Sequence, residues 1–371
     1  VRHGYAHEET RNLYAAADAL AQAADDSRLL LLARYGVWAA HHVREDVGAA
    51  LGVGEQMVDE AARRQDLDLT MMAHRMLGTS ETMAGRFDHA RVSFERARAL
   101  YAPARHHGLA ISTGIDPLVG LDSYQALAMV ASGHLDRARA LTDAVQQALQ
   151  ADGQPVNAKA YGYWHVALAA ALMRESAKAG TLAEGVEALA SARGLSFWEA
   201  SAGSVVAWAR LDAGDPAGAV TGMSDSLAAA AATGSGILGG LLKSVLAEAL
   251  AVTGDSAALA MAEAAEALAR RSAALYALAE IQRRQGVVLS LLRPAATAEA
   301  EAAFRRALAT AAEQKAHFWE LRAATSLARL WADQGRRGEA LDLLAPIHGR
   351  FTEGFDLPDL VEAGALLDAL A

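Results

Sequence analysis

Apolar and polar residues alternate along this chain with the spacing of amphipathic helices. The stretch from His74 to Leu100 holds two such segments, and Gly85 lies between them as the turn that joins them. Alanine and leucine dominate the chain, whereas valine and isoleucine are sparse outside a few places, which favours helices over strands. The pattern therefore predicts an all-helical protein.

A small residue about five positions after a turn residue recurs at nearly one period. The successive spacings are 40, 48, 41, 40, 40, 41 and 40 residues, and many of the positions follow a turn glycine such as Gly133 or Gly214. Eight matches at nearly one period indicate an internal repeat of helical hairpins. The recurring positions are Ala50, Ala90, Ala138, Ala179, Ala219, about Leu259, Ala300 and Ala340.

The same stretch carries the tetratricopeptide (TPR) pattern, with Leu77-Gly78 early and Ala90 and Phe94 later. Gly78 and Ala90 are small enough for two helices to approach closely, and Phe94 fills the gap to the next hairpin. Since neither helix can bury its apolar face alone, neighbouring hairpins must stack. The predicted fold is an all-α, TPR-like α-solenoid of about eight helical hairpins that forms a right-handed superhelix with a concave inner surface.

We expect a single superhelical domain over residues 1–371. A helix at about 8–24 should close off the first hairpin, repeats should fill about 28–350, and a helix at about 358–370 should cap the other end. The 48-residue spacing predicts an inserted loop at 101–121 between two stacked hairpins. Pro103 should stop the preceding helix, while Asp116 and Pro117 should begin the next one.

Net charge and amino-acid composition exclude several classes of function. A net charge of −10 argues against nucleic-acid binding as the main task. The absence of cysteine excludes disulfides, thiolate catalysis and cysteine metal sites, and no apolar run is long enough to predict a membrane span. We expect a cytoplasmic protein and, because the chain begins at Val1 and not at Met, a piece of a longer polypeptide.

Weak motifs for chemistry do not form a complete site. The glycine-rich segment from Gly234 to Ser244 ends in Lys-Ser, but two leucines separate Gly240 from Lys243, so it predicts an inter-repeat turn with at most a minor anion contact. The histidine pairs, such as His41-His42, lack further ligands. We expect no catalytic site, no metal and no cofactor.

The first helix of each hairpin should line the concave surface, where aromatic residues and arginines carry binding energy. The alternative for each tryptophan is packing between hairpins, and for each arginine solvation or pairing with a neighbouring acid. The predicted ligand- or partner-binding set is Tyr35, His42, Arg75, Thr79, Ser123, Leu127, Tyr161, Trp164, Ser204, Trp208, Lys243, Ser244, Glu248, Arg283, Arg322 and Arg329.

The inserted loop adds a second group of candidates. Insertions in solenoids often emerge on the binding face, so we expect Arg105, His106, His107 and Asp116 near the mouth of the groove. The alternative is a capped joint with solvated histidines.

The C-terminal part resembles the tetratricopeptide region of large bacterial signalling ATPases. The resemblance rests on 320–324 (ELRAA), 327–331 (LARLW) and 351–356 (FTEGFD). The segment from Tyr101 to Pro117 is also similar to the family, but Thr113-Gly114 replaces an aromatic-Gly pair and Leu118 replaces a glycine. Such proteins typically begin with a class III adenylate/guanylate cyclase or winged-helix domain, followed by an AAA/STAND module. The resemblance implies a sensor or scaffold arm that biases upstream domains.

Three hypotheses remain beside a disfavoured enzymatic one. The chain is a repeat module that captures a protein or peptide partner in a groove, or a small-molecule or peptide receptor with an enclosed pocket. The third is an arm that forms homo-oligomers through apolar residues of its last helix, such as Leu360 and Leu366. A compact pocket rather than an open groove distinguishes the receptor from the first.

Overall fold

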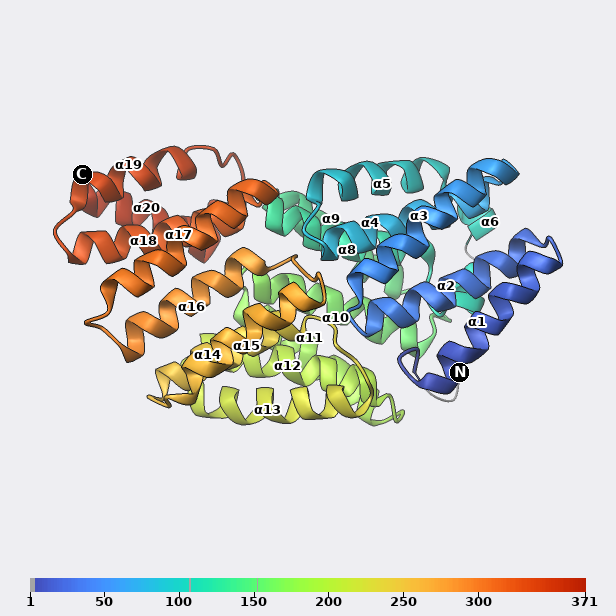
Figure 1. The fold of residues 1–371 in the computed structure, drawn as a ribbon, viewed down its shortest axis with the longest axis horizontal. Helices are drawn as coiled ribbons and strands as arrows, with labels where there is room; N and C mark the ends of the chain where they lie inside the picture. Colours follow the sequence, from blue (N-terminus) through green and yellow to red (C-terminus); the bar gives the residue numbers. More distant parts are fainter. Residues whose placement is uncertain (1–3, 107, 152) are drawn as a thin grey trace.

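The computed structural model describes residues 4–106, 108–151 and 153–371. These residues form twenty α-helices joined by short turns, with no strand among the part described (Figure 1). The helices of the first half are α1 (Glu8–Ala23), α2 (Ser27–Val43), α3 (Val47–Arg64), α4 (Leu67–Met83), α5 (Phe87–Leu100), α6 (Pro103–His106), α7 (Leu109–Thr113), α8 (Pro117–Ser132), α9 (Leu135–Leu149) and α10 (Val156–Leu172). The second half contains α11 (Ser176–Ser191), α12 (Ser196–Asp212), α13 (Pro216–Ala232), α14 (Gly239–Val252), α15 (Ala257–Arg271), α16 (Leu278–Leu292), α17 (Thr297–Gln314), α18 (His317–Asp333), α19 (Arg337–His348) and α20 (Pro358–Leu370).

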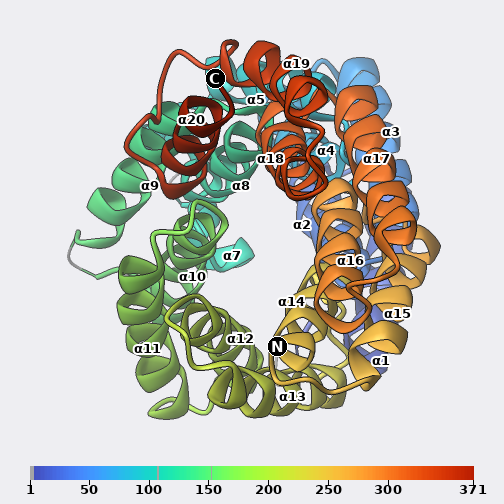
Figure 2. The same cartoon turned by 90° about the vertical axis from the view of Figure 1, so that its left-hand side faces the viewer.

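The helices form the stacked hairpins that the repeat predicts, from α2/α3 and α4/α5 through α8/α9 to α18/α19. Seen along the long axis, the hairpins wrap around a centre, with the first helix of each hairpin inside and the second outside (Figure 2). Helix α1 packs against α2 at one end, and α20 packs against α18 and α19 at the other. The prediction of an all-α, TPR-like solenoid is confirmed.

The recurring small residue is the fourth residue of the second helix in seven hairpins, and each of these alanines is buried. The sixth hairpin differs, because Ala258, the second residue of α15, is buried, whereas Leu259 is half-buried. The expected position at Leu259 is therefore off by one residue. A single methyl group at these positions leaves room for the facing helix.

Two glycines explain how closely paired helices approach. A Cβ atom on Gly78 of α4 would lie 2.8 Å from the ring of Phe94 on α5, and one on Gly286 of α16 would lie 2.5 Å from the ring of Phe304 on α17. Both rings are buried, so they have little freedom to move aside. These pairs repeat the same glycine-phenylalanine contact in two hairpins.

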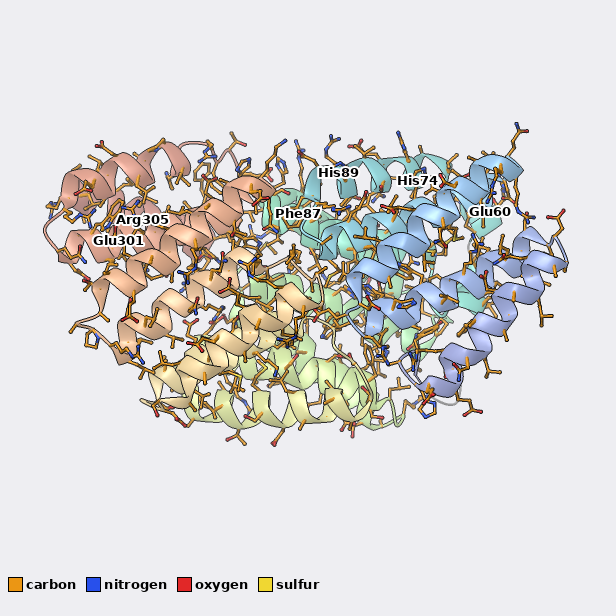
Figure 3. The ribbon with its side chains drawn as sticks, viewed as in Figure 1. Glu60, His74, Phe87, His89, Glu301 and Arg305 are labelled. Carbon is orange, nitrogen blue, oxygen red and sulfur yellow. The ribbon has the colours of Figure 1, made fainter. Side chains whose placement is uncertain are left out.

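The outer helices carry ordinary surface ion pairs. Arg305 and Glu301 lie one turn apart on α17 with 2.8 Å between Nη2 and Oε1 (Figure 3). Residues four positions apart lie on the same side of a helix, so their side chains can form an ion pair. Such pairs keep the outer face of these helices polar.

The solenoid is wound tightly enough for its later hairpins to rest on its earlier ones. We call α1–α11 the first superhelical turn and α12–α20 the second. The N–H of Gly236, between α13 and α14, donates to the carbonyl oxygen of Val43 at 2.9 Å, and the N–H of Val47 donates to the oxygen of Ser272 at 3.2 Å. The N–H of Tyr276, between α15 and α16, donates to the oxygen of Met83 at 2.9 Å. The turns within hairpins of the first superhelical turn thus form hydrogen bonds with the loops between hairpins of the second.

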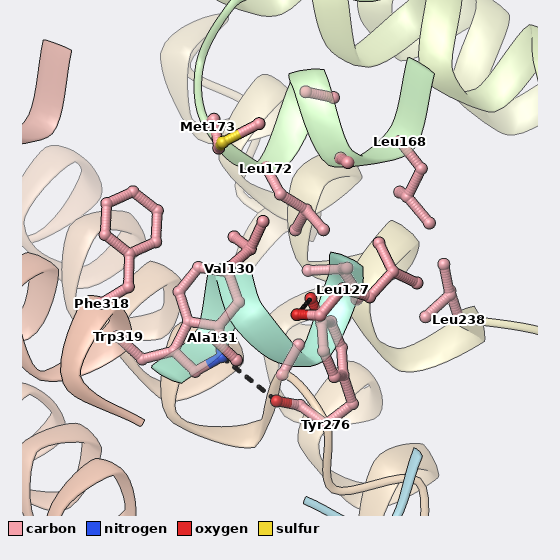
Figure 4. Packing of buried hydrophobic residues seen from close by; sticks show 14 of the residues in the cluster. Leu127, Val130, Ala131, Leu168, Leu172, Met173, Leu238, Tyr276, Phe318 and Trp319 are labelled. Atoms are coloured by element: carbon pink, nitrogen blue, oxygen red, sulfur yellow. Dashed lines mark hydrogen bonds between the residues drawn. The ribbon is translucent and has the colours of Figure 1, made fainter. Parts of the chain in front are cut away.

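Apolar side chains cover the same contact. Tyr276 and Trp319 from the second turn pack beside Leu127 and Val130 of α8 (Figure 4). The Tyr276 hydroxyl donates to the carbonyl oxygen of Leu127 at 3.1 Å, which satisfies a buried polar group. The two turns therefore share one hydrophobic core.

Ion pairs hold the rim of this contact. Lys315 Nζ lies 2.6 Å from Asp88 Oδ2, and Arg139 binds Asp356 through two nitrogens at 2.9 and 2.8 Å. These four side chains belong to opposite turns and lie near the surface. Each such pair contributes little stability, and both join the first turn to the second.

The glycine-rich segment takes part in the same contact. Glu45, 3% exposed between α2 and α3, accepts hydrogen bonds from the backbone N–H groups of Leu238 and Gly239 at the start of α14. Burial raises the pKa of Glu45 to about 8, against the lowering effect of those two hydrogen bonds. The segment is an inter-repeat turn, as predicted, and the acid at its helix N-terminus belongs to the chain itself.

The glycine contacts generate a test. We expect Gly286→Ala to destabilise the protein by about 1–3 kcal/mol, because the new methyl group overpacks against Phe304. The matched control is Gly185→Ala in α11, where a Cβ atom meets nothing within 4 Å, so the gain in helix propensity should stabilise by about 0.5–1 kcal/mol. Urea unfolding followed by circular dichroism measures both, and equal effects would contradict the packing described.

Candidate functional site

A cavity of about 410 Å³ lies among the inner helices of the second turn. Its walls come from α12, α14, α16, α18 and α20, with Arg174 reaching in from the end of α10. The charged lining consists of five arginines and six carboxylates: Arg174, Arg283, Arg284, Arg322, Arg329, Asp212, Glu248, Glu280, Asp333, Asp359 and Glu362. Val287, Leu330 and Phe304 supply apolar wall. We call this the charged cavity.

Glu280 is the centre of the charge network. Its side chain is 0% exposed and lies 2.7 Å from Arg283, 3.1 Å from Arg284 and 3.6 Å from Arg322. Burial alone would raise the pKa of this carboxyl, but the three guanidinium groups outweigh burial and hold the pKa well below its ordinary value. Glu280 is therefore a buried anion that fixes three cations around it.

Arg322 and Arg284 make further contacts that hold their guanidinium groups in place. Arg322 donates through Nη2 to the carbonyl oxygen of Leu172 at 2.6 Å and to Asp359 at 2.7 Å, so it also joins the two turns. Its guanidinium lies over the ring of Phe318, 4.6 Å from the centroid. Arg322 Nε has no hydrogen-bond partner. A buried donor without a partner costs stability, which the other contacts of Arg322 must offset.

The neighbouring arginine is held in a similar way. Arg284 pairs with Glu248 across to α14, and its guanidinium lies over the ring of Trp208 on α12, 5.1 Å from the centroid. At the other side of the cavity, Glu362 of α20 binds Arg174 at 2.8 Å and Arg329 at 2.9 Å. The lining is thus an ordered array of both charges rather than a set of mobile surface side chains.

A second cluster surrounds Arg75 of α4, which is 1% exposed. Its guanidinium carbon lies 5.5 Å from the ring centre of Tyr35 and 5.9 Å from that of Trp38, both on α2. Trp38 stacks on His42 at 5.0 Å, and His42 Nε2 lies 2.5 Å from the hydroxyl of Tyr124. We call this group, together with Tyr161 and His165 of α10, the aromatic cluster.

The structure sorts the predicted groove residues into these two places. Glu248, Arg283, Arg322 and Arg329 meet in the charged cavity, with Trp208 behind Arg284. The aromatic cluster brings together Tyr35, His42, Arg75 and Tyr161, and Trp164 borders it through a ring contact with His165 at 4.7 Å. Their role in binding stays a prediction.

Burial corrects the expectation of an open groove. Thr79 and Ser204 are buried, and their hydroxyls donate to the carbonyl oxygens of Arg75 at 3.1 Å and Ser201 at 2.7 Å, respectively. Trp164 is buried and donates to the Ser201 oxygen at 2.9 Å. Ser123, Leu127 and Ser244 are likewise buried, while Lys243 is half-buried. The tight winding turns most of the predicted inner face into interior.

The inserted segment forms the short helices α6 and α7, and α7 points toward the central axis in Figure 2. Arg105 and His106 both bind Asp68 at the start of α4, and His106 is only 1% exposed. His106 is therefore not solvated, and His107 lies outside the described residues. Asp116 accepts from the N–H of Leu118 at 2.8 Å and from the hydroxyl of Tyr101 at 3.0 Å, so it caps α8 as expected.

The sequence reasoning missed the residues that organise the cavity, chiefly Glu280, Arg284 and Asp359. One signal was present, because Glu280 precedes Arg283 and Arg284 by three and four residues, which places all three on one helix face. Asp359 gave no such signal, since its link to Arg322 depends on how α20 folds back on α18.

No family model matches the chain, and no curated protein matches it. Among solved structures, a Rap protein complexed with competence and sporulation factor is 12% identical with a TM-score of 0.59, covering 92% of this chain and 96% of that one. The Cut9–Hcn1 hetero-tetramer of the APC/C is 13% identical with a TM-score of 0.56, covering 98% of this chain and 59% of that one. At these identities the likeness shows the fold alone, a TPR-like α-solenoid.

A third solved structure belongs to the class that the sequence resembles. It is a signal transduction ATPase with numerous domains and a tetratricopeptide repeat sensor, from Pyrococcus horikoshii, 11% identical with a TM-score of 0.44 over 86% of this chain and 49% of that one. The overlap is too loose to carry an argument. Within the described residues, none of the helices is long and apolar enough to cross a membrane.

The charge network predicts a pH-dependent effect. Glu280→Gln removes the carboxylate that forms ion pairs with Arg283, Arg284 and Arg322, so we expect it to destabilise the protein by about 3–5 kcal/mol at neutral pH. Because the folded pKa lies below the ordinary value of 4.5, the contribution of Glu280 is complete above pH 4.5 and is lost as the pH falls toward the folded pKa.

Urea midpoints of both proteins between pH 7 and pH 3 measure this effect. The difference between wild type and Glu280→Gln should shrink in acid. Glu299→Gln, at a surface carboxylate paired with Arg293 at 3.4 Å, is the control and should stay within about 0.5 kcal/mol of wild type. A Glu280→Gln protein as stable as this control would contradict the network.

Proposed function

We propose that this chain is a non-catalytic receptor that holds a small ligand bearing both positive and negative groups, such as the end of a short peptide, in the charged cavity. The observation that carries the proposal is the cavity of about 410 Å³ lined by ordered guanidinium and carboxylate groups. That volume falls within the range of small-molecule sites.

The state of the walls supports ligand binding over simple packing. Arg284 and Arg322 are already fixed by Trp208, Phe318 and Leu172, so little side-chain ordering is required when a ligand arrives. Arg329 is half-exposed at 49% and Asp333 is exposed, which places a cation and an anion where a ligand meets solvent.

A cavity of this size, partly open to solvent at Arg329 and Asp333, supports the receptor over the open-groove module among the expected functions. A structure with the same fold holds competence and sporulation factor, which is consistent with ligand capture by such a solenoid. We further propose, from the family resemblance, that occupancy biases attached upstream domains of ATPase or cyclase type in a cytoplasmic regulator. Helix α20 is the natural reporter, because its Asp359 and Glu362 contact both the cavity and Arg174 of the first turn.

The test is a binding screen with a blocked variant. Free amino acids and short peptides are added to the wild type, and the ligand that binds should raise the free energy of unfolding by about 2.7 kcal/mol at 100 times its dissociation constant. Ser326 of α18 lines the cavity and accepts from Arg283 at 3.4 Å, so Ser326→Phe should fill the space and abolish the shift.

The matched control places the same ring outside. Ser224→Phe on the exposed face of α13 should leave both the fold and the ligand-induced shift as in the wild type. Calorimetric titration of the responding ligand separates loss of affinity from loss of stability. The proposal fails if no amino acid or peptide stabilises the wild type, or if Ser326→Phe binds as tightly as Ser224→Phe.

A further inference from the structure

The guanidinium of Arg75 is a buried cation without a counter-charge. Only 1% of the residue is exposed, and none of the carboxylates in the described part of the chain forms an ion pair with it. The rings of Tyr35 and Trp38 face it at 5.5 and 5.9 Å. Cation–π attraction at such distances does not replace the hydration that an unpaired cation loses on burial.

Several polar atoms around Arg75 also lack partners. They are Nε and Nη1 of Arg75 and Nε2 of His165. The hydroxyls of Tyr35 and Tyr161 lie against the Arg75 guanidinium as its polar neighbours. The Nδ1 atom of His165 lies 2.8 Å from the carbonyl oxygen of Tyr161, so it carries the ring proton and donates it there. Nε2 of His165 is then an acceptor, so the donors that lack a partner are Nε and Nη1 of Arg75. Buried donors without a partner are rare in folded proteins, and two of them on one cation indicate an occupant that accepts hydrogen bonds.

His42, His165, Tyr124 and Tyr161 surround Arg75 and supply no negative charge near neutral pH. Burial, followed by repulsion from His165 and Arg75, lowers the pKa of His42 to about 3. Burial also lowers the pKa of His165 to about 3, against the hydrogen bond to Tyr161, and burial raises the pKa values of Tyr124 and Tyr161. Near neutral pH these four side chains are uncharged, so Arg75 is the single charge of the cluster.

The shape of the site limits the occupant to a small one. Gly120 on α8 has no side chain to displace the guanidinium, because a Cβ atom there would collide with Nη2 of Arg75. The enclosing rings of Tyr35, Trp38, His42 and Tyr124 are all less than a tenth exposed. An organic acid of ordinary size would have to open this packing, so the occupant must be small.

We propose that Arg75 and the Tyr161 hydroxyl hold a chloride ion in the aromatic cluster. The ion supplies the missing negative charge and accepts hydrogen bonds from Arg75 and Tyr161. It thereby links α4 of the second hairpin to α10 of the fourth, across α8. This site is separate from the charged cavity, and it acts as a fixed counter-ion rather than as the captured ligand.

A salt-replacement experiment tests the ion. Thermal and urea unfolding of the whole chain are followed as sodium chloride replaces sodium gluconate at constant ionic strength. Above the dissociation constant, each tenfold rise in chloride should raise the folding equilibrium constant about tenfold in the wild type. Arg75→Met should abolish this dependence, whereas Arg63→Met, at a surface arginine that is 72% exposed, should keep it.

A crystal grown or soaked in sodium bromide provides a second readout that does not require the variant to fold. An anomalous difference peak within contact distance of the Arg75 guanidinium is the expected result. The proposal is overturned if the wild type responds to chloride no more than Arg75→Met does. It is also overturned if the bromide crystal shows no peak there, in which case an enclosed water satisfies the orphaned atoms.

Discussion

The contact between the two superhelical turns is the constraint on which the rest of the structure depends. Three backbone hydrogen bonds, from Gly236, Val47 and Tyr276, tie loops of one turn to hairpin tips of the other. Tyr276 and Trp319 then bury their rings against α8. A solenoid repeat specifies only how neighbours stack, whereas this contact sets the pitch of the whole superhelix.

The tight pitch decides what kind of inner surface the protein has. Because the inner helices face one another across a short distance, charged residues on them are desolvated and must find partners. In the second turn, Glu280 and Asp359 provide those partners for the arginines, and the remaining space is the charged cavity. In the first turn, Arg75 receives rings instead of carboxylates. The same repeat thus produces two different interiors.

The local parts of this structure are readable from sequence, and the long-range parts are not. Gly78 with Phe94 and the buried alanines follow from the repeat, since each contact joins residues close in the chain. Nothing in the sequence marks Val43 as the partner of Gly236, so the closing of the second turn on the first has no local signal. The helix pattern therefore predicts which face of each helix points inward. It does not predict that the closing of the turns buries most of that face.

The most direct test of this closed superhelix is cross-linking between the turns. Because the chain has no cysteine, only the introduced thiols can react. Asp88→Cys combined with Lys315→Cys places two thiols where an ion pair of 2.6 Å now joins the turns. We predict that a short bis-maleimide links this pair within one monomer. The same reagent should leave Asp88→Cys combined with Asp225→Cys, on the outer helix α13, unlinked. An unlinked 88–315 pair in the folded monomer would contradict the closed superhelix.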